Sequence, residues 1–174
     1  MSYYKKMKLE LLLILKFIKN KIITNIKKII QEYRLYKYSK KYNCNFGNDL
    51  NFLGPLENLK IGENTTINSY ANFRFSNGKI NFGRDCLVGR NVTILTQSYN
   101  LDKQKKISLE EMLTSDVNIG DNVLLGSNII IMPNVDIGNH AVVGAGSVVT
   151  KNIGDFEIWA GSPAKFIRKR KVNE

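Results

Sequence analysis

A dense group of cations near residue 170 is one feature of this sequence that can do chemistry. Five basic side chains fall within seven residues, namely Lys165, Arg168, Lys169, Arg170 and Lys171. Guanidinium and ammonium groups at this density suit phosphate oxygens, which arginine binds through two N–H donors and lysine binds as a point charge. The same pattern is typical of a solubilising basic tail, so phosphate binding needs support from the rest of the chain.

The side chains that most often carry acid–base, redox or metal chemistry are scarce. The sequence holds one histidine, His140, and two cysteines, Cys44 and Cys86. Isolated residues do not make a metal-ligand cluster, and two cysteines are too few for a disulfide scaffold. We expect no metal site, and we interpret both cysteines as free thiols in a reducing compartment. The position of His140 between Asn139 and Ala141 favours an exposed turn residue over a catalyst.

The positive charge is concentrated in residues 1–42. This segment carries twelve lysines and arginines against two glutamates, whereas the other 132 residues carry fourteen basic and thirteen acidic side chains. Such an uneven distribution, without a recognition motif, argues against a nucleic-acid partner.

Apolar side chains in the same segment recur at steps of three and four residues, which is the spacing of one helix face. They are Leu11, Leu15, Ile18, Ile22, Ile26, Ile29 and Tyr33. We therefore predict a basic amphipathic helical arm over residues 1–42. Two roles fit it equally: a helix lying on an anionic membrane surface, or a helix packed on its own domain or in an oligomer.

A repeat of six residues governs the second half of the chain. Apolar side chains recur at Ile119, Leu125, Ile131, Ile137, Val143 and Val149, and a small or β-branched residue stands two positions before each. A hexad means one short strand and one turn, with three hexads in each coil of a solenoid. The apolar residue points inward, and the glycine that follows four of them serves a turn where a Cβ would crowd the backbone.

The same register recurs earlier with insertions. Its apolar positions are Phe46, Phe52, Ile61, Ile67, Phe73, Phe82, Val88 and Ile94. Two steps of nine residues indicate insertions at corners, where Gly54-Pro55 and Asn77-Gly78 favour turns. The polar, aperiodic segment at about 98–116 predicts an extended loop, and long loops in compact repeats are usually functional. We predict a mainly β chain with a parallel β-helix over residues 43–160, followed by a basic closing segment over 161–174.

With these hexads in place, the chain resembles the hexapeptide-repeat acyltransferases. Within them it resembles the maltose and galactoside O-acetyltransferases and the capsule or lipopolysaccharide acetyltransferases. The resemblance covers about residues 46–170, and its most specific part is the run 142–151 followed by 160–165 and by Ile167-Arg168. It implies a left-handed parallel β-helix, a homotrimer with sites between neighbouring chains, and acetyl-CoA as cosubstrate.

The resemblance also implies which residues bind the cofactor. Backbone groups of Ser127 and Ala145 would hold the pantetheine arm, and the phosphate end would meet Thr150, Lys151, Lys165 and Arg168. Asn72, within Tyr70-Ala71-Asn72-Phe73, matches an asparagine of the catalytic pocket, where an amide can orient the acceptor or the base. An asparagine at a β-helix corner is the other interpretation of Asn72.

One departure from the family pattern concerns the catalytic base. Members place a histidine at the start of the extended loop, and here Tyr99 stands at that position, with Gln97 nearby. Three interpretations follow: an amine acceptor, which attacks a thioester without prior deprotonation; a substitute base such as Tyr99 or Asp102; or a catalytically silent trimer that binds or scaffolds. A phenol is ordinarily protonated at neutral pH, so a tyrosine base needs a special environment.

The retained CoA-binding positions favour an enzyme over a scaffold. We predict an acetyltransferase that moves an acetyl group from acetyl-CoA to a hydroxyl or amino group of a sugar, free or linked to a nucleotide or lipid. Tyr99 and Asn72 are the candidate catalytic residues. The expected setting is surface-polysaccharide biosynthesis in the cytoplasm, with residues 1–42 able to hold the protein at the inner face of the membrane.

Overall fold

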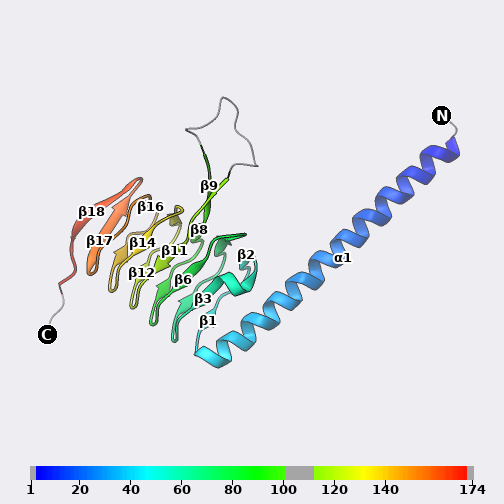
Figure 1. The fold of residues 1–174 in the computed structure, drawn as a ribbon. Coiled ribbons are helices and arrows are strands. Elements are labelled where there is room, and N and C mark those ends of the chain that lie inside the picture. The colour runs from blue at the N-terminus through cyan, green and yellow to red at the C-terminus, as the bar shows by residue number, and fades with distance from the viewer. Residues whose placement is uncertain (1–2, 101–111, 172–174) are drawn as a thin grey trace. The chain divides into compact units, whose positions relative to one another are not determined.

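The structure, a computed structural model, describes residues 3–100 and 112–171 of the 174-residue chain. The chain divides into two compact units, Met1–Lys40 and Lys41–Glu174. The first unit is helical and the second is mainly β (Figure 1).

The N-terminal segment forms one helix, α1 (Tyr3–Tyr42). It continues without interruption because neither glycine nor proline occurs before Gly47. Asn43 follows its last turn with a φ of 53°, the left-handed conformation that commonly terminates helices. Ile22 and Ile26 on its apolar face are each about half exposed. In the described part of this helix, no stretch is both long and apolar enough to cross a membrane.

The second unit is a coil of short strands that visits three parallel sheets in turn. Sheet A holds β1 (Asn45–Phe46), β4 (Thr66–Ile67), β7 (Leu87–Val88), β12 (Leu124–Leu125), β15 (Val142–Val143), β17 (Glu157–Gly161) and β18 (Ala164–Lys169). Sheet B holds β2 (Asn51–Leu53), β5 (Asn72–Arg74), β8 (Thr93–Leu95), β13 (Ile130–Ile131) and β16 (Val148–Val149). Sheet C holds β3 (Leu59–Ile61), β6 (Ile80–Phe82), β11 (Val117–Ile119) and β14 (Asp136–Ile137).

Successive strands of the coil belong to different sheets, and each pairs in parallel with the strand of the next coil that lies in its own sheet (Figure 1). The chain therefore turns three corners per coil, which we name the A/B, B/C and C/A corners after the sheets that they join. This arrangement confirms the predicted mainly β repeat of parallel strands.

The core of the coil consists of the apolar hexad residues. Those of the late repeats, from Ile119 to Val149, are at most 4% exposed. In the early coils larger side chains fill the same space, and the ring of Phe73 stacks between Phe52 at 4.8 Å and Phe82 at 5.7 Å. Cys86, two positions before Val88, is also buried, as expected for a packing residue.

The insertions of the early coils all fall at the B/C corner. The first contains the short helix η1 (Leu56–Asn58) and the second contains Asn77-Gly78. In the third coil, β9 (Gln97–Tyr99) pairs antiparallel with β10 (Met112–Thr114). Most residues of this two-stranded ribbon fall within the extended loop predicted at 98–116. Residues 101–111 of that loop lie outside the described part of the chain.

The coil ends in an antiparallel pair formed by β17 and β18. β17 continues sheet A beside β15, with Trp159 paired to Val143. β17 still follows the coil in sheet A, and the chain turns back between Gly161 and Ala164.

Candidate functional site

A ladder of backbone hydrogen bonds runs along the A/B corner. Its left-handed residues are Asp49, Tyr70, Asn91, Asn128 and Gly146. From the second coil onward, each donates its N–H to a carbonyl of the preceding coil: Tyr70 to Asn48 (3.0 Å), Asn91 to Ser69 (3.1 Å), Asn128 to Arg90 (2.9 Å) and Gly146 to Ser127 (2.8 Å). The ladder places Ser127 and Ala145 at the same corner position of adjacent coils.

The ladder ends at Ala145 and leaves peptide groups without partners. Earlier in the corner, the hydroxyls of Ser69 and Ser127 accept the N–H groups of Asn48 (3.1 Å) and Arg90 (3.2 Å). Ala145 has no hydroxyl to accept the N–H of Ser127 in this way. Within the described residues, the N–H groups of Ser127 and Ala145 and the carbonyl of Ala145 therefore make no hydrogen bond. Such groups can bind a ligand that carries amides.

Sheet B separates this corner from three other predicted positions, Thr150, Lys151 and Tyr99. Thr150 and Lys151 follow β16 at the B/C corner, where both are exposed. Tyr99 lies on β9, which leaves the B/C corner of an earlier coil, and its side chain is 45% exposed. The other substitute base, Asp102, lies outside the described residues.

Asn72 lies on β5 in sheet B, half-buried, so it is a strand residue and not a corner residue. Its Oδ1 accepts a long hydrogen bond of 3.4 Å from Nδ2 of Asn51. Tyr70, two residues earlier, takes the corner position instead. Asn72 is paired with Thr93 of β8, the strand that leads into the ribbon bearing Tyr99.

The two cations that the sequence assigns to the phosphate end lie on β18. Lys165 is opposite Ala160, and the neighbouring Gly161 donates its N–H to Oγ of Ser147 (3.1 Å), at the end of the A/B corner. Arg168 is opposite Ile158, further along the strand. The structure thus brings Ser127, Ala145 and Lys165 to one edge of sheet B, places Thr150 and Lys151 on its other edge, and places Arg168 on sheet A.

His140 lies at the C/A corner, away from these residues. Its φ is 60°, and its ring stacks on Phe156 with the centroids 4.5 Å apart. The residue is half-buried and not exposed as predicted, because Phe156 of the next coil covers it. A turn role accounts for its position.

The two cysteines are free and buried. Burial raises the pKa of both thiols, most directly by removing water from around the sulfur. Each Sγ donates to a carbonyl of the next coil, Cys44 to Gly62 and Cys86 to Gly120, both at 3.1 Å. Neither is suited to nucleophilic chemistry.

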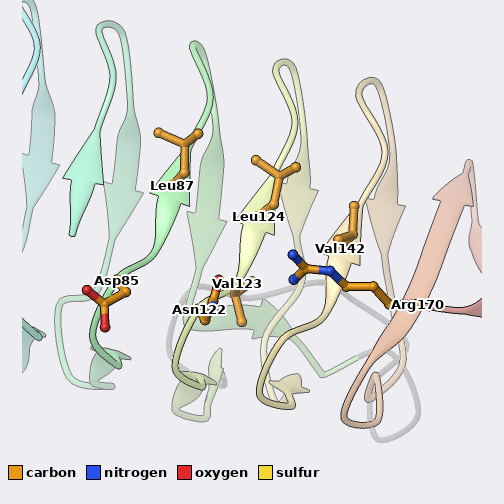
Figure 2. A pocket seen from close by; sticks show the side chains of 7 residues that line it. All are labelled: Asp85, Leu87, Asn122, Val123, Leu124, Val142 and Arg170. Atoms are coloured by element: carbon orange, nitrogen blue, oxygen red, sulfur yellow. The ribbon is translucent and has the colours of Figure 1, made fainter. Parts of the chain in front are cut away.

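A shallow groove of about 340 Å³ lies on the outer face of sheet A. Figure 2 shows Leu87, Leu124 and Val142 in a row, with Asp85 at one end and the Arg170 side chain reaching from the other end so that its guanidinium lies between Leu124 and Val142. None of the predicted site residues lines it. In each of three coils the sequence places an apolar residue directly before the inward apolar residue, and a residue at that position faces outward. This pattern was the signal that could have indicated the groove.

Comparison with known proteins matches residues 116–151 to the bacterial transferase hexapeptide family (six repeats). The galactoside O-acetyltransferase of Escherichia coli (strain K12) is 35% identical over 115 residues, which cover 64% of this chain and 54% of that protein. The crystal structure of a maltose O-acetyltransferase from Clostridium difficile 630 is 31% identical with a TM-score of 0.59, covering 74% of this chain and 67% of that one.

A galactoside acetyltransferase solved in complex with coenzyme A is 27% identical with a TM-score of 0.62, covering 80% of this chain and 71% of that one. The chain spans about half the length of the first curated relatives that it matches. The six-residue repeat, the three parallel sheets and these relatives agree, and the chain belongs to the hexapeptide-repeat acyltransferase family.

Proposed function

We propose that this protein is an acetyltransferase that moves an acetyl group from acetyl-CoA to a hydroxyl or amino group of a sugar or sugar-like acceptor. The observation that carries the proposal is the set of free peptide groups at Ser127 and Ala145. The pantetheine arm of CoA contains amides, which pair with free peptide N–H and C=O groups. The relative solved with coenzyme A supports the same cosubstrate.

The cations have a separate role in this proposal. Lys165 and Arg168 on β18 are exposed and would bind the phosphates of CoA. Thr150 and Lys151, which are exposed at the B/C corner, would reach the same phosphates from a neighbouring chain of the trimer. The arm would lie along the A/B corner, with its phosphate end toward β18 and its thioester toward the earlier coils. Asn72 lies in one of these earlier coils, where the acceptor would bind, and Tyr99 at the B/C corner would reach that acceptor from a neighbouring chain of the trimer.

The transfer step needs little covalent chemistry from the protein. The acceptor oxygen or nitrogen attacks the thioester carbonyl, the carbon–sulfur bond breaks, and the sulfur leaves as CoA thiolate. The proton of the acceptor passes to a base or to the departing thiolate. Tyr99 is the candidate group for this proton, and the Asn72 amide would orient the acceptor.

A catalytically silent trimer that binds CoA is the second candidate. Tyr99 favours it, because an exposed phenol on a ribbon is a weaker base than the imidazole that the family pattern places there. The test is release of free thiol from acetyl-CoA in the presence of glucose, glucosamine and nucleotide-linked sugars. Release of free thiol that depends on an added acceptor supports the acetyltransferase. Binding of acetyl-CoA without release on any acceptor would establish the silent trimer.

We also propose that the coil is left-handed and that three chains assemble. The outer faces of sheets A and B carry exposed apolar side chains such as Leu87, Leu124 and Ile130. The outer face of sheet C instead carries a polar ladder in which Asn81 donates to Asn118 (2.8 Å) and Asn118 to Asp136 (2.7 Å). Two apolar faces and one polar face suit a trimer, in which each chain meets two neighbours.

The arm would contact an anionic membrane surface at the inner face of the cell membrane. Its described part exposes isoleucines at the steps of one helix face, including Ile18, Ile22 and Ile29. The lysines of the same segment add positive charge, which attracts anionic headgroups. A cytoplasmic setting in surface-polysaccharide biosynthesis fits the two buried free thiols and the sugar acetyltransferase relatives.

Liposome flotation tests the arm. Ile22→Asp in the full chain should reduce flotation with anionic vesicles strongly, whereas Asn20→Asp, with the same change of charge on the polar face, should reduce it only slightly. Equal loss in the two variants would contradict a membrane-facing apolar surface. Equal flotation of the unaltered protein with neutral vesicles would contradict a role for anionic headgroups.

A further inference from the structure

The A/B corner holds a pair of side chains that the hexad repeat does not require. The guanidinium carbon of Arg90 lies 5.6 Å from the ring centroid of Tyr70. Both side chains are exposed, and no carboxylate within the described part of the chain forms an ion pair with Arg90. The aromatic ring therefore holds a cation in place while its charge stays available to a ligand.

The backbone of Tyr70 is unusual for this residue type. Its φ is 67°, a left-handed conformation that asparagine, aspartate and glycine tolerate and bulky residues rarely adopt. The equivalent residues of the other coils are Asp49, Asn91, Asn128 and Gly146. A strained position filled by a tyrosine in place of the tolerant types points to a role for the ring.

Arg90 lies where an acceptor would meet the acetyl group, an argument that rests on the proposed function. Arg90, Ser127 and Ala145 occupy the same corner position of successive coils, about 4.8 Å apart and joined by the ladder bonds of Asn128 and Gly146. Lys165 lies at the end of this column beyond Ala145. A carrier whose phosphates bind at Lys165 would therefore direct its thioester along the column toward Arg90.

We propose that Arg90 is a specificity-determining residue that binds an anionic group of the acceptor, and that Tyr70 positions its guanidinium. Arginine offers parallel N–H donors that match the oxygens of a carboxylate or a phosphate. Both an acidic sugar and a nucleotide-linked sugar present such oxygens close to a pyranose ring. A neutral free sugar offers Arg90 no partner of opposite charge.

Calorimetric titration of the full chain with glucose, glucuronic acid and UDP-glucose tests this proposal. At least one anionic probe should bind about tenfold or more tightly than glucose, the gain of a charge-assisted hydrogen bond. Preference for glucuronic acid alone identifies a carboxylate, and preference for UDP-glucose alone identifies a phosphate. Arg90→Gln should remove the preference and Arg90→Lys should restore part of it.

Two further variants separate positioning from stability. Tyr70→Phe keeps the ring and should keep the preference, whereas Tyr70→Asn fits the backbone and should weaken the preference without lowering the melting temperature. Arg84→Gln is the matched control. Arg84 precedes Arg90 by six residues in the same coil but lies at the C/A corner, where it pairs with Asp121 at 3.1 Å.

Equal binding of all three probes to the unaltered protein, or an unchanged preference in Arg90→Gln, would overturn the proposal. So would weaker acetyl-CoA binding in Arg90→Gln with unchanged acceptor binding, because Arg90 would then serve the cofactor. The titrations are made without acetyl-CoA. A protein that fails to bind acetyl-CoA thus refutes the proposed function separately, whatever the sugar probes show.

Discussion

Tyr99 is held by backbone pairing at the position where a general base is expected. It lies opposite Met112 in the antiparallel ribbon of β9 and β10. Because the ribbon fixes the backbone, a different side chain at residue 99 would extend from the same Cα position. This makes the identity of the side chain testable apart from the fold.

We expect Tyr99→His to raise kcat for a hydroxyl acceptor, by up to about 10²-fold, because an imidazole can accept a proton near neutral pH. For an amine acceptor we expect little change, since a neutral amine attacks without a base. Steady-state release of CoA thiol from glucose and from glucosamine measures both.

Leu113→His is the matched control for this substitution. Leu113 is 52% exposed and lies on the other strand of the same ribbon, opposite Ser98. An equal rise in this variant, or no change at residue 99 with any hydroxyl acceptor, would show that Tyr99 does not occupy the position of the base.

The site was only partly predictable at this scale. Ser127 and Ala145 are eighteen residues apart, which is three hexads, so the period alone predicts the same corner of adjacent coils. Their free peptide groups were not predictable, because these depend on the absence of a hydroxyl at Ala145 and on the end of the ladder there. The contact of Arg90 with Tyr70 joins two adjacent coils, and no local spacing in the sequence indicates it.

The stacking of coils depends on glycine at one position of the A/B corner. A Cβ at Gly126 would lie 2.6 Å from the nitrogen of Ala145 and 2.9 Å from its Cα. Both atoms belong to the backbone and cannot move aside cheaply. Gly126→Ala should therefore lower the free energy of unfolding by about 1–3 kcal/mol and weaken acetyl-CoA binding at Ala145. Urea unfolding and calorimetry measure these two effects.

Gly146→Asn distinguishes crowding from backbone strain. Gly146 has a φ of 73°, and no atom lies within 4 Å of the position that a Cβ would take. Asparagine already fills the equivalent corner residues Asn91 and Asn128. This variant should change the unfolding midpoint little. If Gly146→Asn lowers the unfolding midpoint as much as Gly126→Ala does, the corner excludes any side chain, and close contact between coils is not the cause of the lost stability.

The closing strands depend on one carboxylate. Oε2 of Glu157 accepts the N–H of Gly154 (2.9 Å) and the indole N–H of Trp159 (2.8 Å). The Gly154 N–H first, and then the Trp159 indole, hold the pKa of Glu157 below its ordinary value. A lowered pKa means that the ionised group stabilises the fold at neutral pH, and that this contribution is lost as the pH falls through the lowered value.

Glu157→Gln should therefore lower the urea midpoint at pH 7, and this difference should shrink between pH 7 and pH 2 as the native carboxylate takes up its proton. Unfolding curves between these pH values measure the difference. Glu63→Gln, an exposed residue, should show a small difference with no such trend. A constant gap between Glu157→Gln and the unaltered protein at every pH would refute the role of the charge.

Elements were predictable where the period was strict. The hexad indicated every inward residue from Ile119 to Val149, and the steps of nine located the insertions at Gly54-Pro55 and Asn77-Gly78. The ribbon of β9 and β10 was missed because two strands of three residues in a polar segment give no periodic signal.

At the scale of the whole molecule, the three outer faces of the coil differ in character. Leu124 on sheet A is 40% exposed in a groove beside Leu87 and Val142. Sheet C instead satisfies its polar side chains with one another, as Asn81 does with Asn118. The exposed apolar area would be costly in an isolated chain, and burial between chains removes that cost.

Leu124→Asp should therefore dissociate the assembly, because a carboxylate buried in an apolar interface loses its hydration, and a single ion pair with Arg170 in the same groove would not fully offset that loss. Sedimentation equilibrium should show three chains for the unaltered protein and single chains for the variant. Asn81→Asp adds the same charge to sheet C and should leave three chains together. If Asn81→Asp dissociates the assembly and Leu124→Asp does not, the chains meet through the polar face of sheet C, and the proposed assembly through the apolar faces of sheets A and B is refuted.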